Sequence, residues 1–326
     1  EKMTFALNDF SEKQKEKWIF KKFKFIFDYL DTSDVSGKPI LNVSVREKLS
    51  KQYYCRYLHR VKEYVTGIKS AGIDEVFDDE SVQTFLNDIL QEVDIFENNV
   101  NILQNRFVSP LSRIGTNFYK YYLTDTIMVD SVRCIELSFS PFNNRTFGFL
   151  GRLYVPENDT SMFIKKVKLN VPKAINLNFV ENMLIEQDFV KSADGTRLKT
   201  KDDMTVEFEI IPSTQGLYAR RTVNYGDYSF EEPENIDIFN EEAKVVEADD
   251  ARKMPEEYWK ENRLAPIKKN ENAISRLMAQ LREVPAFYWT EKVVKVLVSG
   301  YIPTGSDETS KFDFGPMNTT ISGNTL

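Results

Sequence analysis

The stretch FVENMLIEQDFVKSADGTRLKTKDDMTVEFEII, residues 179–211, decides the predicted fold because it has the pattern of a β-hairpin. Apolar and polar residues alternate on both sides of Asp194-Gly195, a dipeptide that favours a tight turn between antiparallel strands. Glu207 and Glu209 stand on one face of the second strand, and its other face is apolar. A sheet built from such strands has one buried face and one face in water.

The same pattern fills the chain from residue 116 to about 230. Residues 146–172 predict a hairpin around the turn PENDT, and residues 117–129 are predicted to pair with 131–141. Consecutive hairpins of this kind build one antiparallel meander. The apolar face of this sheet is predicted to include Ile135, Leu137, Phe139, Met183, Ile185, Val206, Phe208 and Ile210.

Three further strands are predicted near the N-terminus. Residues 1–10, EKMTFALNDF, alternate between apolar and polar side chains, as a half-buried strand does. Residues 38–54 and 60–70 show the same alternation on either side of a short polar segment, so they are predicted to pair with each other.

Two amphipathic helices are predicted among these strands. The first lies near residues 11–30, where Ser11 is a suitable N-cap and a continuous apolar stripe faces a lysine-rich side. A basic, aromatic helix can lie on an anionic membrane surface, but packing on the sheet with its lysines in water is the commoner arrangement. The second helix is predicted near 80–104, because apolar residues recur there at steps of four and three. Those residues are Val82, Leu86, Ile89, Val93, Phe96, Val100 and Leu103.

The composition changes towards the C-terminal part of the chain. Residues 227–250 hold ten acids and one base, which is typical of a solvated connector. Residues 270–284 predict a helix that Pro285 ends, and the alternation at Phe312 and Phe314 predicts a strand. The predicted organisation is a sheet domain at 1–230 with helices near 11–30 and 80–104, an acidic connector at 231–253, a helical segment at 254–310, and the start of a strand at 311–326.

The overall composition excludes several classes of protein. A hydrophobic content of 41% supports a packed core rather than a disordered chain. The formal net charge is 43 − 50 = −7, which argues against a nucleic-acid partner. No stretch approaches the roughly 20 consecutive apolar residues that span a bilayer as a helix, so we expect this part of the chain to lie outside the membrane.

The residues that usually carry chemistry are sparse. Cys55 and Cys134 are the two cysteines, neither lies in a CxxC motif, and the sequence leaves open whether they form a disulfide. His59 is the sole histidine, so a site with two histidine ligands is excluded and few options remain for a catalytic triad. The sequence also has no GxxxxGK loop, no GxGxxG and no nucleophile elbow. We therefore predict no catalytic residues, no metal site and no cofactor, and expect that the chain is not an enzyme.

Two charged dipeptides in the sheet region are predicted to be structural. Asp202-Asp203 is expected to be solvated, since adjacent carboxylates do not converge across a cleft. Arg220-Arg221 lies on a strand, so its two side chains point to opposite faces and only one could meet a ligand. A cross-strand ion pair with Glu207 or Glu209 is the simpler expectation.

A family resemblance rests on several longer motifs. They are VSPLSRIGTNFYKYYLTDT (108–126), CIELSFSP (134–141), FGFLGRLYVPENDTSMFIKKV (147–167), INLNFV (175–180), DGTRLKTKDDMTVEFEIIP (194–212), and GYIPTG with KFDFGP (300–305 and 311–316). With these motifs the chain resembles a family of uncharacterised outer-membrane proteins of Bacteroidetes. The resemblance implies a parent protein with an N-terminal carboxypeptidase-regulatory-like domain, then this region in the periplasm, then an outer-membrane β-barrel. It implies no reaction and no catalytic residues, and KFDFGPMNTTISGNTL (311–326) would lead into the first barrel strand.

A second resemblance concerns the order of the predicted elements. A strand, a helix, a strand pair, helices and then a run of hairpins is similar to the half-open barrels of lipoprotein-carrier and lipoprotein-sorting proteins, which bind acyl chains in a hollow. This resemblance implies an α+β fold in which one large curved antiparallel sheet, a half-open barrel, packs on several helices. Element order alone does not establish function.

Two functions fit these observations. In the first, the apolar face of the sheet is only partly filled by the helices and leaves a hollow that binds a lipid, an acyl chain or an apolar segment; a fully packed core is the opposing expectation. In the second, the domain is an interaction scaffold that positions the barrel or recruits periplasmic protein partners, whose identity the sequence does not indicate, through its sheet edges or the acidic connector.

Overall fold

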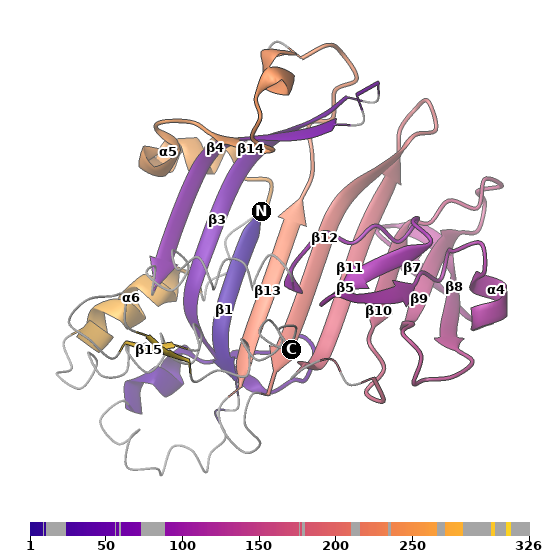
Figure 1. The fold of residues 1–326 in the computed structure, drawn as a ribbon, viewed down its shortest axis with the longest axis horizontal. Helices are drawn as coiled ribbons and strands as arrows, with labels where there is room; N and C mark the ends of the chain where they lie inside the picture. Colours follow the sequence, from indigo (N-terminus) through magenta and orange to yellow (C-terminus); the bar gives the residue numbers. More distant parts are fainter. Residues whose placement is uncertain are drawn as a thin grey trace, which may run out of the picture.

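One large sheet dominates the computed structural model. It contains twelve strands, and their spatial order is β14-β4-β3-β1-β13-β12-β11-β10-β9-β8-β7, with β2 paired to β3 outside this path (Figure 1). The structure describes residues 1–8, 10, 24–55, 57–58, 60–72, 89–175, 177, 180–209, 216–233, 236–265, 271–282, 301–303 and 311–313.

The strands of this sheet run antiparallel to their neighbours, except that β14 runs parallel to β4. The meander predicted from residue 116 onward is confirmed as β7 to β13, which follow one another in space as they do in sequence. The strand bounds are β1 Lys2–Asn8, β2 Asp31–Thr32, β3 Pro39–Cys55, β4 Arg60–Gly72, β7 Tyr119–Val129, β8 Val132–Pro141, β9 Leu150–Pro156, β10 Lys166–Asn170, β11 Val180–Lys191, β12 Arg197–Phe208, β13 Leu217–Asn224 and β14 Val245–Glu247.

The first strand of the chain lies in the interior of the sheet, between β3 and β13. On one side β1 pairs with β13, where Leu7 faces Leu217, and on the other it pairs with β3, where Leu7 faces Leu41. It therefore joins the long meander to the β3–β4 pair, and the N-terminal segment predicted as a strand is confirmed.

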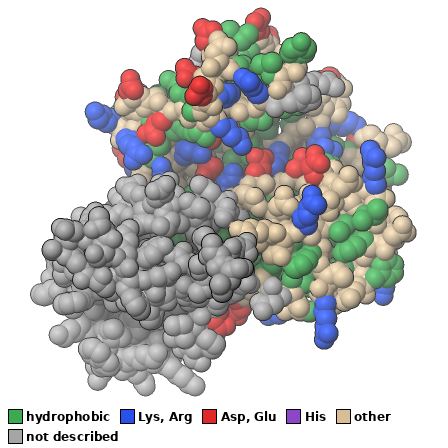
Figure 2. All heavy atoms as spheres, in the orientation of Figure 1, with side chains coloured by type: hydrophobic (Ala, Val, Ile, Leu, Met, Phe, Trp, Pro, Cys, Tyr) green, Lys and Arg blue, Asp and Glu red, His purple; other side chains and the backbone are tan. Residues whose placement is uncertain are grey.

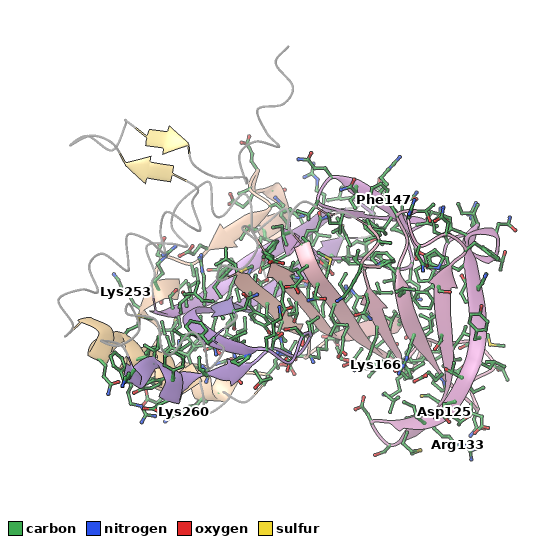
Figure 3. The ribbon with its side chains drawn as sticks, turned by 90° about the horizontal axis from the view of Figure 1, so that it is seen from below. Asp125, Arg133, Phe147, Lys166, Lys253 and Lys260 are labelled. Carbon is green, nitrogen blue, oxygen red and sulfur yellow. The ribbon has the colours of Figure 1, made fainter. Side chains whose placement is uncertain are left out.

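The two faces of the sheet differ in chemistry along its whole width. We call the side that carries Leu41, Ala219, Val206 and Leu169 the apolar face, because these side chains belong to one large buried cluster. The other side, which we call the polar face, carries charged ladders such as Lys166 with Asp188, 2.9 Å apart. Figure 3 shows Lys166 on the opposite side of the sheet from Phe147, whose ring packs 5.3 Å from that of Phe107 in the buried cluster.

Among the described residues, two groups of elements cover the apolar face. At the β3 end lie the 3₁₀ helix η2 (Lys24–Tyr29) and helix α6 (Glu271–Arg282), which bury Ile26, Ile274 and Leu277 in the cluster. Over the meander lies a small hairpin of β5 (Asn99–Ile102) and β6 (Asn105–Val108), drawn in front of the sheet in Figure 1.

The helix predicted near 80–104 is wrong in its C-terminal part. Residues 95–98 form turns and β5 begins at Asn99; Leu103 and Gln104 both have positive φ angles, 47° and 63°, as in a tight hairpin turn. Val100 and Ile102 are buried while Asn99 and Asn101 are exposed, so alternation, not helical spacing, describes this segment. Residues 73–88 lie outside the described residues.

The acidic connector is docked on the sheet. It contains the 3₁₀ helices η3 (Ile236–Asn240) and η4 (Ala251–Lys253), and between them β14 adds a parallel strand to the edge of β4. Most of its side chains are exposed, as predicted for a solvated segment. The further short elements are α4 (Gly115–Phe118), α5 (Glu256–Asn262) and the hairpin of β15 (Tyr301–Pro303) and β16 (Lys311–Asp313), so the strand predicted at Phe312 has a partner.

The described part of the chain is rich in sheet, with few helices, rather than clearly α+β. Of the helix predicted near 11–30, residues 24–29 form η2, and residues 11–23 lie outside the described residues. No helix in the described ranges combines the length and apolar character needed to cross a membrane. On the face seen in Figure 2, charged side chains gather near the connector and hydrophobic ones near β5 and α4.

Candidate functional site

The residues predicted to line an apolar site share one face of the sheet. Phe139, Met183, Ile185, Val206 and Phe208 are all buried, with no more than 3% of each residue exposed, and they belong to the large apolar cluster. Leu137 packs against that cluster and is partly exposed, as is Ile135 next to it on β8. Ile210 lies outside the described residues. Shared orientation is confirmed for the seven described residues, whereas a role in binding stays a prediction.

The cover over these residues is tight where the structure describes it. The side chains of Val93, Ile95, Ile102 and Phe107 come from the segment around the β5–β6 hairpin and are 2% exposed or less. Beside Met183 a cavity of about 30 Å³ remains, which is room for a water molecule but not for an acyl chain.

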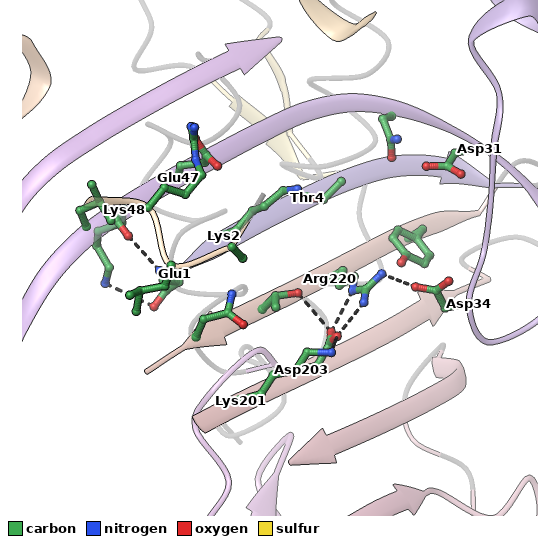
Figure 4. A pocket seen from close by; sticks show the side chains of 18 of the residues that line it. Glu1, Lys2, Thr4, Asp31, Asp34, Glu47, Lys48, Lys201, Asp203 and Arg220 are labelled. Carbon is green, nitrogen blue, oxygen red and sulfur yellow. Dashed lines mark hydrogen bonds and ion pairs between the residues drawn. The ribbon is translucent and has the colours of Figure 1, made fainter. Parts of the chain in front are cut away.

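A larger cavity lies on the polar face, where no site was predicted. We call it the polar pocket; its volume is about 460 Å³ (Figure 4). Its floor is the polar side of β12, β13, β1 and β3, one end is closed by the turn after β2, and Trp259 to Ala265 of α5 and the following loop line it from another side. Its charged lining comprises the five acids Glu1, Asp31, Asp34, Glu47 and Asp203 and the five bases Lys2, Lys48, Lys201, Arg220 and Arg263.

Asp203 and Arg220 form the centre of the polar pocket. Arg220 donates through Nε to Oδ1 of Asp203 at 2.8 Å and through Nη2 to Oδ2 at 2.6 Å, and its Nη1 also donates to Asp34. Thr222 Oγ1 donates to Asp203 at 3.2 Å, and Lys201 Nζ lies 3.1 Å from Oδ2. Burial alone would raise the pKa of Asp203, but the hydrogen bonds and charges of Arg220 and Lys201 outweigh it and lower that pKa.

A buried glutamate fixes the turn that closes one end of the pocket. Glu207 is fully buried, and its carboxylate accepts hydrogen bonds from Ser33 Oγ at 2.5 Å, Ser36 Oγ at 2.6 Å and Asn182 Nδ2 at 2.8 Å. Because Ser33 and Ser36 belong to the turn after β2, this carboxylate attaches the turn to the sheet. Glu207 was one of the two glutamates expected to pair with an arginine, and the structure shows it bound to Ser33, Ser36 and Asn182 instead.

The opposite wall of the pocket is also ion-paired. Lys48 Nζ lies 3.4 Å from Glu1 and 2.8 Å from Glu63, and Arg263 pairs with Glu47. Acids and bases balance, so the pocket offers hydrogen-bonding groups without a net charge. Nε of Arg263 is buried and has no hydrogen-bond partner among the described residues, which leaves one donor for an oxygen of a polar molecule.

A second buried polar cluster lies at the border of the apolar face. Asp202 and Gln187 face each other across β12 and β11 and are 2% and 0% exposed. Gln187 Nε2 donates to Asp202 Oδ1 at 3.3 Å and to the carbonyl of Val93 at 2.7 Å. Oδ2 of Asp202 has no hydrogen-bond partner in the described part of the chain; the cations of Lys199 and Arg221 are 3.5 and 3.9 Å away. Burial raises the pKa of Asp202 despite these two cations.

Replacing Asp202 with asparagine is expected to raise the free energy of unfolding at neutral pH by about 1 kcal/mol, because a neutral amide avoids the cost of burying the charge and can donate to Gln187. The raised pKa means that the contribution of Asp202 to stability is complete below the unfolded pKa of about 3.9 and is lost as the pH rises through the folded pKa. The advantage of Asp202→Asn should therefore grow as the pH rises above about 4 and then level off. Denaturant unfolding across this pH range measures it.

Asp203→Asn is the matched control, one residue along on the opposite face. The pKa of Asp203 is lowered, so its contribution to stability is present above the unfolded pKa and is lost as the pH falls through the folded pKa. This control should lose stability at neutral pH. Changes of the same sign in both variants would contradict the assignment of the two environments.

Both charged dipeptides therefore differ from the sequence prediction. Asp202 and Asp203 are 2% and 5% exposed, not solvated. Arg220 pairs with Asp203 and Asp34, and Arg221 lies 3.5 Å from Glu1, so each arginine has an acidic partner other than Glu207. Side chains alternate between the two faces along β12 and β13, so one acid and one arginine lie on each face. This alternation can be recognised in the sequence.

The remaining candidates for chemistry are the two cysteines, the histidine and any group of metal-ligating side chains. Cys55 is half-buried and Cys134 is buried, and both are free. His59 lies outside the described residues. Among the residues that the structure describes, no group of three or more His, Cys, Asp and Glu side chains could hold a metal ion.

Comparison with known proteins gives one family match. The model of a family described as a family of unknown function (DUF5686) matches residues 8–225, more than half of the chain. No curated protein matches. Among solved structures, a domain from Vibrio parahaemolyticus named as an outer membrane lipoprotein-sorting protein aligns with 73% of this chain and 89% of its own, at 8% identity and a TM-score of 0.24. A TM-score this low does not establish that the two proteins share a fold.

Proposed function

This chain belongs to the DUF5686 family, whose function is unknown, and we propose that it is a non-catalytic domain that binds a lipid or an acyl chain against the apolar face of its sheet. The observation that supports this is the width of that face. Its buried side chains run from Val43 on β3 to Phe139 on β8 as one cluster, and of the elements that the structure describes, η2 with α6 cover one part of it and the β5–β6 hairpin covers another. In the proposed form the sheet curves around its ligand as a half-open barrel.

The proposed location is the periplasmic face of the outer membrane. What supports it is the resemblance of the motifs between 108 and 316 to outer-membrane proteins of Bacteroidetes. In that arrangement a carboxypeptidase-regulatory-like domain precedes this region and a β-barrel follows it. The absence of catalysis is part of the proposal and rests on the lack of recognised catalytic motifs in the sequence.

Leu137→Ser tests the apolar site at a position where the apolar face is partly exposed. The polar hydroxyl should weaken binding of a fluorescent fatty acid by about fivefold to tenfold, because part of a leucine side chain no longer contributes apolar contact. Ile127→Ser is the matched control: Ile127 is also partly exposed and lies on the neighbouring strand, but it packs against the small cluster of Val129, Cys134 and Tyr154 on the other face. The control should bind as the unaltered protein does.

Native mass spectrometry of the full-length protein, extracted from membranes, provides the second measurement. It should show lipid bound to the unaltered protein and to Ile127→Ser, and less lipid on Leu137→Ser. Circular dichroism verifies that both variants fold. Failure of the folded, unaltered protein to bind either the probe or a native lipid would refute the proposal.

The alternative, an interaction scaffold that acts through sheet edges or the connector, has less support. The connector uses β14 to pair with one edge of the sheet, at β4. The other edge, β7, is interrupted by an irregularity between Leu123 and Asp125 and also carries the charge of Lys120. Bulges and charges of this kind discourage the addition of a partner strand.

A further inference from the structure

A two-stranded ribbon projects from the sheet where β1 no longer accompanies β3. The last residue of β3 that pairs with β1 is Glu47, opposite Lys2, but β3 continues to Cys55 and pairs there with β4 alone. We call residues 48–65 the β3–β4 ribbon; Figure 1 shows it running past the start of β1. Strands that extend beyond the body of a sheet bury little of their surface. Packing in the core therefore does not explain why the side chains at the tip are apolar.

The two faces of the ribbon have different surroundings. Arg60 Nη1 donates to the carbonyl of Phe239 at 3.2 Å, and Lys62 Nζ donates to the carbonyl of Ala243 at 2.6 Å, so this face packs on the connector. Val61 lies between them in sequence and points the other way, towards the side of Tyr54, its cross-strand neighbour.

That other face and the tip are apolar and exposed. The exposed fractions are 66% for Tyr54, 44% for Val61, 92% for Tyr57 and 46% for Leu58. Exposing two tyrosines, a leucine and a valine to water is unfavourable in free energy unless a partner covers these side chains. The connection that carries Tyr57 and Leu58 is short, so the patch is small.

The charge of the ribbon is opposite to that of the whole chain. Residues 48–65 contain one acid, Glu63, and the five bases Lys48, Lys51, Arg56, Arg60 and Lys62, in a chain whose net charge is −7. Lys51 and Arg60 are both exposed; Arg60 is the first residue of β4 beside the tip, and Lys51 lies four residues before the end of β3, on the same face as Arg60. The one acid of the ribbon, Glu63, is paired with Lys48, whose Nζ lies 2.8 Å from its carboxylate.

We propose that the tip of the β3–β4 ribbon docks the domain on a lipid surface that carries anionic headgroups. Tyr57 and Leu58 enter the interface between headgroups and acyl chains, where tyrosine is favoured, and Lys51 and Arg60 meet lipid phosphates. A stable protein interface buries about 1,200–2,000 Å², far more than one short turn supplies, whereas a bilayer accepts single inserted side chains. This surface is separate from the apolar face, so the inference goes beyond the proposed function.

Sedimentation with vesicles of phosphatidylcholine, with and without phosphatidylglycerol, tests the proposal. The protein should partition onto the vesicles that contain phosphatidylglycerol and be released by salt. Replacing both tip residues, Tyr57→Ser with Leu58→Ser, should lower the partition coefficient at least about tenfold, and Lys51→Glu should lower it about fivefold or more.

The matched control is Leu123→Ser with Met128→Ser on β7. These side chains are 78% and 63% exposed, as apolar as those of the tip, but lie on the strand at the opposite edge of the sheet. The control should partition as the unaltered protein does. An equal effect of both double variants, partition that ignores phosphatidylglycerol, or no partition at all would overturn the inference. Fatty-acid binding measured on the double tip variant and on Lys51→Glu should be unchanged, which separates a failure of docking from a failure of the proposed apolar site.

Discussion

Arg220→Leu is expected to lower the free energy of unfolding by about 3–5 kcal/mol, because it leaves the buried carboxylate of Asp203 without its main partner. Asp203 is 5% exposed and receives two hydrogen bonds from Arg220, and Lys201, which remains, is a more exposed cation 3.1 Å away. Leucine also cannot hold Asp34 at the end of the polar pocket. Denaturant unfolding at neutral pH measures the loss.

Two further variants identify the cause of that loss. Adding Asp203→Asn to Arg220→Leu should restore part of the stability, because no uncompensated charge then remains in the sheet. Arg133→Leu removes a pair with Glu157 in which both side chains are exposed, at 64% and 40%, and should cost less than about 1 kcal/mol. A loss of that small size for Arg220→Leu would contradict the central role of the ion pair.

The pH dependence of Arg220→Leu should differ from that of the unaltered protein. With Arg220 present, the pKa of Asp203 is lowered, and the stability it contributes is lost as the pH falls through that value. Without Arg220, fewer cations oppose the effect of burial on the pKa of Asp203. Protonation of Asp203 then removes the buried charge and stabilises the variant. The stability difference between the two proteins should therefore shrink as the pH falls below about 4.

Gly151→Ala is expected to cost about 3 kcal/mol or more, because the central strands of the meander have no room for a methyl group there. A Cβ at Gly151 would lie 2.1 Å from the carbonyl oxygen of Lys168 on β10 and 2.6 Å from the Phe139 ring on β8. Gly151 pairs in regular register with both neighbouring strands, so it marks close packing of the Phe139 ring rather than the bend or bulge that a glycine in a strand often indicates.

Gly37→Ala is the control that separates the effect of steric crowding from the effect of an unfavourable backbone conformation. Nothing lies within 4 Å of a Cβ at Gly37, but its φ is +70°, a conformation that alanine adopts at a cost of about 1 kcal/mol. Thermal unfolding should show a much larger shift for Gly151→Ala than for Gly37→Ala. Equal shifts would mean that β9 and β10 can separate at little cost.

Local patterns predicted the strands well because each hairpin contains its own information. Alternation on both sides of Asp194-Gly195 determined β11, β12 and their turn, and Gly195 has the positive φ, 87°, that the turn requires. The same alternation placed all seven described members of the predicted apolar site on one face. Whether that face holds a ligand depends on how tightly the covering segments pack, which alternation does not encode.

The errors arose where a pattern had two interpretations or where distant strands meet. The apolar steps at Val93, Phe96, Val100 and Leu103 fit a helix, but the last two belong to a hairpin whose alternation covers only four residues on each side. The polar pocket depends on β1 lying between β13 and β3, which brings Lys2 and Thr4 beside Arg220, and no local pattern predicts that pairing.

The position of β1 between β3 and β13 also sets the order in which its two neighbours are synthesised. Leu41, its partner on one side, is made soon after Leu7, but Leu217, its partner on the other side, leaves the ribosome 210 residues after Leu7 (217 − 7). At about 5–20 residues per second, that delay is on the order of ten seconds or more. For this interval a growing chain presents one open, half-apolar strand edge, which is available for pairing with other chains until β13 has been made.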